Sequence, residues 1–190
     1  MRAALAIFTV GHSTHPIEEF LRILDAHGVR QLVDVRTIPR SRRNPQFNQE
    51  DLAASLKDAG ILYSHMPGLG GLRKPRRDSI NSGWRNASFR GYADYMQTPE
   101  FRANLKRLIA LASDMPTAIM CAEAVPWRCH RSLIADALVA RDVAVQEILS
   151  AAKVQPHALT PFAEVNGDEV TYPGNDRNLR LQFDGPEALS

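Results

Sequence analysis

Short apolar runs alternate with amphipathic stretches along most of the chain, as strands and helices do in an α/β domain. In the first amphipathic stretch, Ile17, Phe20, Leu21 and Leu24 recur at helical spacing, and Gly28 ends the pattern. The alternation predicts a three-layer α/β fold: a mostly parallel sheet of about five strands with helices on both faces. Strands are expected at 5–10, 31–36, 61–66, 117–122 and 144–149, and helices at 16–27, 48–59, 92–112 (interrupted near Pro99) and 130–141.

After Pro156 the sequence becomes polar and rich in turn signals. We therefore predict one α/β domain over residues 1–182, with 157–182 as a C-terminal tail packed on it and 183–190 as a frayed terminus. Residues 67–88 form a long glycine-containing loop, which in a compact domain is more often functional than idle.

The composition is that of a globular chain, with 190 residues, 44% hydrophobic and 23% charged. No apolar run reaches the length of a membrane span, so no membrane association is expected. The apolar N-terminus stops at Gly11 and has no convincing cleavage site, so we interpret it as a buried strand rather than a signal peptide. Two cysteines without a secretion signal predict a cytoplasmic protein with reduced thiols.

The net charge of +2 is unevenly distributed. Residues 36–90 hold eleven Lys/Arg against four Asp/Glu, concentrated in the runs Arg36–Arg43 and Arg73–Arg77. The runs are either two solvated loops or a positive face that attracts phosphate or nucleic acid. Aromatic residues interleave with arginines near the second run, which suits either base stacking or a lid packed over the domain: Trp84, Arg85, Phe89, Arg90 and Tyr92.

Four successive predicted strands end in polar or ionisable groups, although their middles are apolar. Because ligands of parallel sheets bind at the carboxyl ends of the strands, we expect these groups to converge on one site. They are His12 and Ser13 after the first strand, Asp34 and Arg36 at the second, Tyr63, Gly70 and Gly71 at the third, and Cys121 and Glu123 at the fourth.

Individual residues in this set have more than one interpretation. Asp34 lies in a buried strand and needs a partner, for which Arg36 is the obvious choice, either as a structural pair or as an arginine held for an oxyanion. His12 is a candidate base. Ser13 or Thr14 is more simply explained as a helix cap.

The most informative segment is 117–131, which contains both cysteines and opens a helix. Arg128, His130 and Arg131 place cations at the positive end of a helix dipole, which predicts a bound anion or pairing with Glu123. Cys121 is the preferred nucleophile, because a thiol near arginines and a helix start has a lowered pKa; a plain buried cysteine is the alternative. Cys129 could act as a resolving thiol, and His130 as a structural histidine facing the sheet.

The spacing does not favour a phosphatase-type cradle, because six residues separate Cys121 from Arg128 and the loop contains Pro126. Seven residues between the cysteines is also not a recognised zinc spacing. We therefore predict no metal site and no cofactor.

These motifs together resemble the domain of unknown function 488 family, uncharacterised bacterial and archaeal proteins, over nearly all of Thr9 to Gly174. The resemblance implies a three-layer α/β domain and brings no assigned reaction or cofactor. It rests on Gly11-His12-Ser13, Asp34-Val35-Arg36, Pro39 with Ser41, Phe47, Tyr63, Leu69-Gly70-Gly71, Cys121-Ala-Glu123, Cys129-His130-Arg131, the run Pro156-His157-Ala-Leu-Thr160, and Tyr172-Pro173.

The function predicted is an enzyme acting on a phosphate-bearing or nucleotide-like substrate, a Cys- or acid/base-dependent hydrolase or transferase, with oligomeric state left open. Two alternatives remain: a nucleic-acid-binding module using loops 36–43 and 73–90, and a thiol redox sensor. The expected catalytic residues are Cys121, Glu123 and His12, and the expected substrate- or anion-binding residues are Ser13, Asp34, Arg36, Tyr63, Gly70, Gly71, Arg128, Cys129, His130 and Arg131.

Overall fold

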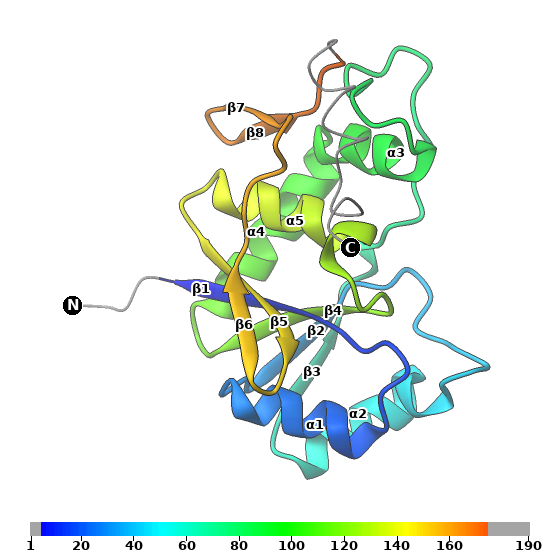
Figure 1. Cartoon of the computed structure of the whole chain (residues 1–190), viewed down its shortest axis with the longest axis vertical. Coiled ribbons are helices and arrows are strands. Elements are labelled where there is room, and N and C mark those ends of the chain that lie inside the picture. Colours follow the sequence, from blue (N-terminus) through cyan, green and yellow to red (C-terminus); the bar gives the residue numbers. More distant parts are fainter. Residues whose placement is uncertain (1–4, 175–190) are drawn as a thin grey trace, which may run out of the picture.

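The computed structural model describes residues 5–174, in which a six-stranded sheet forms the middle layer (Figure 1). The strand order is β3-β2-β4-β1-β5-β6; the first five of these strands are parallel to their neighbours, and β6 runs antiparallel to β5. The strands are β1 (Ala6–Gly11), β2 (Gln31–Asp34), β3 (Leu62–His65), β4 (Thr117–Cys121), β5 (Ala144–Ser150) and β6 (Lys153–Pro156).

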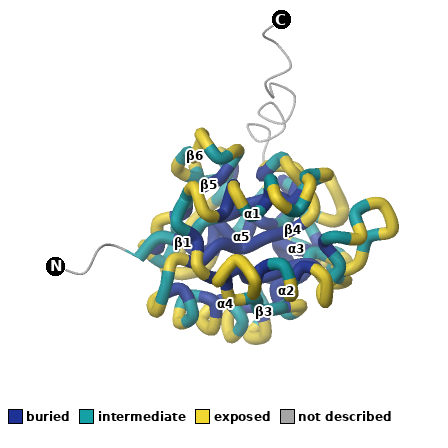
Figure 2. Tube along the Cα trace, turned by 90° about the horizontal axis from the view of Figure 1, so that it is seen from below, coloured by how far each residue is buried: buried dark blue, intermediate teal, exposed yellow. Residues whose placement is uncertain are grey.

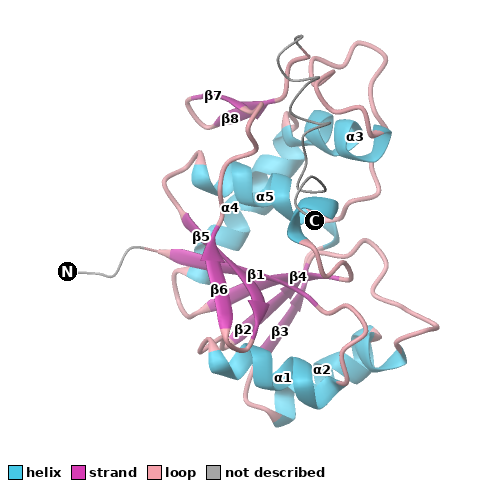
Figure 3. Cartoon of the chain, viewed as in Figure 1, coloured by secondary structure: helices cyan, strands magenta, loops and turns pink. Residues whose placement is uncertain are grey.

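Helices cover both faces of the sheet, so the predicted three-layer α/β class is confirmed. One face packs against α1 and α2, and the other against α3, α4 and α5 (Figures 1 and 3). Figure 2 shows buried residues running through the centre of the molecule and exposed residues on the loops around it. The helices are α1 (Ile17–Ala26), α2 (Gln49–Asp58), α3 (Ala87–Met96), α4 (Pro99–Ala112) and α5 (Arg131–Val139), with short 3-10 turns η1 (Pro45–Phe47), η2 (Pro67–Leu69) and η3 (Pro126–Arg128).

The predicted strands and helices all occur in the structure, but several helix starts differ from the prediction. Neither Ser13 nor Thr14 caps α1, whose N-cap position is Pro16. Asn48 occupies the N-cap of α2, but its side chain accepts a hydrogen bond from Ser41 N (2.9 Å) instead. The stretch expected at 92–112 is two helices, and α3 begins earlier because the Asn86 side chain caps it.

The sheet is larger than the predicted five strands, because β6 follows β5 in a tight antiparallel turn that the sequence reading missed. The C-terminal segment also contains a two-stranded hairpin, β7 (Glu164–Asn166) and β8 (Glu169–Thr171), apart from the main sheet (Figure 3). The predicted tail is described only to residue 174, and its remainder to 182 and the predicted frayed end 183–190 lie outside the described residues.

A buried polar cluster holds this C-terminal segment against α5. The imidazole of His157 lies 2.9 Å from an Asp136 oxygen and 2.8 Å from a Glu147 oxygen. Asp136 also accepts hydrogen bonds from Thr160 Oγ1 (2.6 Å) and Tyr172 Oη (2.7 Å). The cluster fixes the helix that follows the cysteine loop. Within residues 5–174, no helix is long and apolar enough to cross a bilayer.

Candidate functional site

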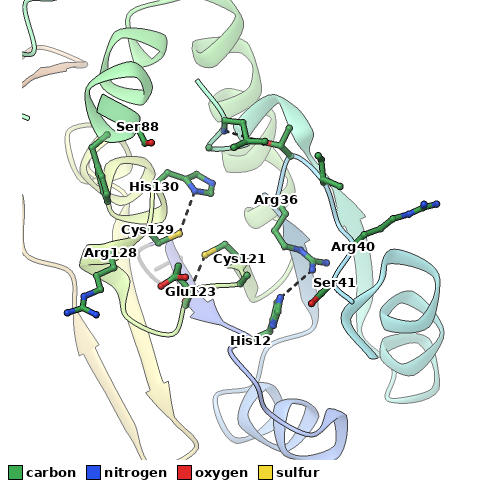
Figure 4. A pocket seen from close by; sticks show the side chains of 16 residues that line it. His12, Arg36, Arg40, Ser41, Ser88, Cys121, Glu123, Arg128, Cys129 and His130 are labelled. Atoms are coloured by element: carbon green, nitrogen blue, oxygen red, sulfur yellow. Dashed lines mark hydrogen bonds between the residues drawn. The ribbon is translucent and has the colours of Figure 1, made fainter. Parts of the chain in front are cut away.

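The carboxyl ends of β1, β2 and β4 meet at one edge of the sheet, as the parallel arrangement predicts. β4 lies between the other two strands, and its last residue, Cys121, is in register with Gly11. A cavity of about 370 Å³ opens at this edge (Figure 4). Its lining comes from four parts of the chain: His12; Arg36, Thr37, Ile38, Arg40 and Ser41; Gly71, Leu72, Ser88 and Phe89; and Cys121, Ala122, Glu123, Arg128, Cys129 and His130.

Asp34 and Arg36 form a buried ion pair in which Arg36 lines the cavity and Asp34 lies behind it, and this confirms the pairing expected from the sequence. Arg36 Nε and Nη2 donate to the two carboxylate oxygens at 2.9 and 2.6 Å. Tyr63 Oη donates to the same carboxylate (2.9 Å), and burial followed by the Asp34 charge raises the pKa of Tyr63. Arg36 Nη2 also donates to Phe47 O (2.8 Å), so much of its guanidinium is already committed within the protein.

His12 is neutral and positioned by both ring nitrogens. Nδ1 lies 2.8 Å from Ser13 O, so Nδ1 carries the proton, and Nε2 accepts from Arg36 Nη1 (3.3 Å). Burial, with the charges of Arg36 and Arg131, lowers the pKa of His12 to about 4. The ring also stacks on Phe47 with centroids 4.1 Å apart. His12 therefore forms part of the wall, and both of its nitrogens are already occupied.

Cys129 has the sulfur most suited to be a thiolate. A hydrogen bond from the Cys121 side chain lowers the pKa of Cys129 to about 3 against the effect of burial, and His130 and Arg131 act in the same direction. The Cys129 Sγ lies 3.5 Å from His130 Nδ1 and accepts from the Arg131 backbone N–H at 3.5 Å. Its location in front of a helix start adds the favourable dipole.

Cys121 is the opposite case. Burial raises the pKa of Cys121 well above its ordinary value, and the hydrogen bond to Cys129 acts in the same direction. Its Sγ also lies 3.9 Å from Glu123 O, to which it donates. Both cysteines are free and buried. The two sulfurs thus differ in their surroundings: those of Cys129 favour a thiolate, and those of Cys121 favour the thiol.

Arg131 is the largest fully buried side chain of the described residues, with 1% of its surface exposed. Its Nη2 donates to Glu123 O (2.7 Å). Within residues 5–174, Nε and Nη1 have no nitrogen or oxygen hydrogen-bond partner, and the sulfurs of Cys121 and Cys129 are its main electrostatic partners. Burial alone would lower the pKa of Arg131, but the sulfurs raise it, so a buried cation lies beside two thiols.

His130 is held by backbone groups that come close to it. Its Nε2 donates to Val35 O at 3.2 Å, so the ring faces the sheet as predicted. Gly71 packs against the ring, and a Cβ at that position would lie 2.6 Å from His130 Nδ1. Gly11 makes similar room for the carbonyl of Glu123, which a Cβ would approach far inside van der Waals contact. These glycines allow the loops to close around the cysteines.

The backbone donors at the start of α5 are largely used within the protein. Cys129 N donates to Pro126 O, and Ser132, Leu133 and Ile134 donate to the carbonyls of Cys129 and His130. An anion at this site therefore has to be bound mainly by side chains. Arg128 and Arg40 are exposed and extend outward on opposite sides of the cavity, with the exposed Glu123 on the Arg128 side (Figure 4).

The predicted site residues divide into two shells. His12, Arg36, Gly71, Cys121, Glu123, Arg128, Cys129 and His130 line the cavity, whereas Ser13, Asp34, Tyr63, Gly70 and Arg131 are not among its lining residues. Sequence reasoning did not assign Thr37, Ile38, Arg40, Ser41, Leu72, Ser88 and Phe89 to the site. The sequence feature that could have indicated them is their location in or next to the two basic loops, which follow predicted strand ends. No group of three or more metal-ligating side chains is found among residues 5–174.

A comparison with protein families gives one match. The model described as "Domain of unknown function DUF488" matches residues 16–138, well over half of the chain. This range contains the Asp34–Arg36 and Cys121–Arg131 segments but not His12. Searches of curated proteins and of solved structures found no match.

Proposed function

The chain belongs to the DUF488 family, and from its site we propose that it is a cysteine-dependent hydrolase or transferase acting on a phosphate-bearing or nucleotide-like substrate. The observation that carries the proposal is the setting of Cys129: its sulfur lines the cavity, contacts His130 Nδ1 at 3.5 Å and lies beside the buried Arg131. A thiolate in an electropositive, cavity-lining position is the arrangement that reactive cysteines share.

The cavity mouth suits a substrate with an anionic group and an apolar or planar part. Arg40 and Arg128 supply exposed positive charge. Ile38 and Leu72 line the same cavity although they are 63% and 72% exposed, and Phe89 adds an aromatic wall. Exposed apolar side chains around a polar site are typical of ligand pockets. A nucleotide base or similar ring would cover them.

The reaction follows from these positions. Cys129 Sγ forms a bond to the electrophilic atom next to the anionic group while the bond to the leaving group breaks. Glu123, which is exposed on the cavity wall, gives a proton to the leaving group and later takes one from the incoming water or acceptor. His12 is not used for proton transfer, because both ring nitrogens are engaged.

The nucleic-acid alternative receives less support from the second basic loop than its sequence suggests. Arg73 donates to Gly68 O and Gly70 O, with its guanidinium 3.5 Å from the centre of the Tyr95 ring. Arg76 is paired with Asp78. These contacts use much of the positive charge inside the loop itself.

The test combines binding with trapping of the adduct. Thermal shift with adenosine monophosphate, ribose phosphate and inorganic phosphate should show the largest stabilisation with the nucleotide, because only the nucleotide has a base that can cover the exposed side chains of Ile38 and Leu72. Arg128→Ala should weaken the shift, and Arg22→Ala, on α1 and paired with Glu19 away from the cavity, should not. Incubation with p-nitrophenyl phosphate and p-nitrophenyl acetate should label the peptide containing Cys129.

Two results would refute the proposal. One is equal shifts in wild type, Arg128→Ala and Arg22→Ala for every ligand, which would place the anion elsewhere. The other is ligand binding with neither ester leaving an adduct on Cys129, which would remove its role as nucleophile. Binding of single-stranded nucleic acid that falls steeply with salt would support the alternative module instead.

A further inference from the structure

The two cysteines of the chain lie at the cavity wall, at the two ends of the loop that joins β4 to α5. Cys121 is the last residue of β4, and Cys129 follows η3 immediately before α5. Both line the cavity, where their sulfurs lie next to each other (Figure 4), and the interaction with Cys121 is the largest of the effects that lower the pKa of Cys129. Both are free thiols. They are 3% and 5% exposed, so the cavity is the route by which a reagent reaches them.

The two sulfurs have different surroundings. Cys129 Sγ accepts from the Arg131 backbone N–H at 3.5 Å and lies beside the buried Arg131 side chain, and both groups favour a negative sulfur. It also lies 3.5 Å from His130 Nδ1, which donates to it when the ring carries both protons, because Nε2 donates to Val35 O. Cys121 Sγ instead donates to a carbonyl oxygen, Glu123 O, a setting that keeps its proton. One sulfur is thus placed to attack an oxidant, and the other to remain a thiol until it is needed.

Arg131 supplies a second, independent observation. Its side chain is 1% exposed, and Nε and Nη1 are buried without a nitrogen or oxygen partner in the described part of the chain. Buried donors are rarely left without an acceptor. These donors lie beside the cysteine sulfurs. An oxygen attached to Cys129 would provide the acceptor that they lack.

From this geometry we propose that Cys129 and Cys121 form a peroxidatic and resolving pair that reduces hydroperoxides and closes into an intramolecular disulfide. Hydroperoxides are small enough for the cavity, and their distal oxygen is the atom a thiolate attacks. The chemistry needs only the two cysteines and Arg131, so it does not depend on the proposed hydrolase or transferase activity.

The steps balance as follows. Cys129 S⁻ attacks the distal oxygen of R–O–O–H; the S–O bond forms, the O–O bond breaks, and the alkoxide takes a proton to leave as the alcohol. Arg131 Nε and Nη1 stabilise the oxygen now held on sulfur. The Cys121 sulfur then attacks the Cys129 sulfur; the S–S bond forms, the S–O bond breaks, and the oxygen leaves as water with the Cys121 proton. The hydroperoxide is reduced by two electrons, and the two cysteines are oxidised to one disulfide.

The disulfide would also remove the Cys129 thiolate from the cavity. Any reaction that uses Cys129 as nucleophile would then stop until a dithiol reductant restores both cysteines. A disulfide is the reversible branch of cysteine oxidation, whereas further oxidation of a lone sulfenic acid is irreversible. Placing Cys121 in contact with Cys129 therefore protects the nucleophile.

The test uses the reduced full chain with tert-butyl hydroperoxide. Wild type should lose both free thiols, stay monomeric on non-reducing gels, yield the crosslinked Cys121–Cys129 peptides on mapping, and recover with dithiothreitol. Cys121→Ser should give a sulfenic acid on Cys129 that dimedone traps, followed by sulfinic acid. Cys129→Ser should leave Cys121 reduced over the same time. Cys121→Ala serves as a second version should Cys121→Ser fold poorly.

Three outcomes would overturn the proposal: wild-type thiols that survive the oxidant, disulfides that link two chains, or wild type that proceeds to sulfinic acid as fast as Cys121→Ser. Peptide mapping of wild type decides the question without any variant. The anion-binding experiment above has a different readout, so the two proposals can fail separately.

Discussion

The ionisation of Cys129 can be read from the pH dependence of a single thiol reaction. The chain has two cysteines, so Cys121→Ser leaves Cys129 as the only thiol and keeps a hydroxyl donor beside it. An aromatic disulfide such as 2,2′-dithiodipyridine reacts with the thiolate over a wide pH range. In wild type the interaction with Cys121, followed by His130 and Arg131, lowers the pKa of Cys129 to about 3. Since the serine hydroxyl introduced at position 121 can donate in place of the thiol, we expect the Cys129 sulfur of the variant to be ionised at pH 5.

The magnitude follows from two opposing effects. A thiol with the ordinary pKa of 9.0 has about one part in 10⁴ as thiolate at pH 5, so Cys129 gains about four decades in thiolate concentration. Thiolate nucleophilicity falls by about 0.4–0.5 decade per pKa unit, which over six units removes about 2.4–3 decades. The net expectation is a rate about 10–40 times that of an ordinary thiol at pH 5, and a rate that stays flat up to pH 8.

The assay compares Cys121→Ser, Cys129→Ser and a small free thiol by release of thiopyridone at pH 5, 6, 7 and 8. The free thiol should accelerate about 1,000-fold over this range. Limited access through the cavity would change the rate of Cys129 by the same factor at every pH. The slope of the rate against pH, rather than the absolute rate, therefore reports the ionisation of Cys129. A rate in Cys121→Ser that rises about tenfold per pH unit would refute the ionisation of Cys129 and with it the choice of nucleophile.

Three further predictions concern substitutions of Arg36, His157 and Gly71. Replacing Arg36 by Ala leaves the Asp34 carboxylate buried and unpaired, and should lower the free energy of unfolding by about 3–5 kcal/mol in urea titrations; an unchanged midpoint would contradict the pairing. Burial opposes protonation of His157, but the two carboxylates raise its pKa to about 9. Its cationic form therefore contributes about 3 kcal/mol to the free energy of unfolding, which is fully present below about pH 6.5 and is lost as the pH rises through 9. The stability gap between wild type and His157→Gln should therefore shrink between pH 6 and pH 10, and a constant gap would exclude this linkage. Gly71→Ala places a Cβ 2.6 Å from His130 Nδ1 and should slow the modification of Cys129 at a cost of about 1–3 kcal/mol in stability, whereas an unaltered rate would show that the ring position is unimportant.

The sequence predicted the fold class and the shared edge because both depend on local periodicity. Apolar runs such as 117–121 mark buried strands, and parallel pairing then brings their ends together. The start of α3 was missed because Gly91 weakens the helical pattern. The structure explains this glycine: a Cβ there would lie 2.5 Å from Arg73 O, so the long loop needs a close approach to the helix.

The different surroundings of the two cysteines could not be predicted, because they depend on contacts that form only in the folded chain. Cys121 has the better sequence position, at a strand end, but its burial and its carbonyl partner keep it protonated. Cys129 gains its character from the His130 ring, whose orientation is set by Val35 O on another strand. The exposed apolar residues of the cavity could not be predicted for the same reason, since Ile38 and Leu72 come together only when their loops fold over one cavity.

The distribution of buried charge connects these observations. Asp34 neutralises Arg36, and His157 is held between Asp136 and Glu147, so each buried cation of these two clusters has a carboxylate partner in direct contact. Arg131 is the exception: its side chain is as deeply buried, and although it feels the Glu147 charge, that carboxylate is hydrogen-bonded to His157 and Gln155.

A buried cation is costly unless an anion accompanies it. The groups that can meet this need at Arg131 are the sulfurs beside it, and Cys129 is the one whose other contacts favour the charged form. The interaction with Cys121 contributes most to the lowered pKa of Cys129, and the buried Arg131 charge acts in the same direction. The same site lowers the pKa of His12, first through burial of its ring and then through the charges of Arg36 and Arg131, so protonation would add a further buried cation there.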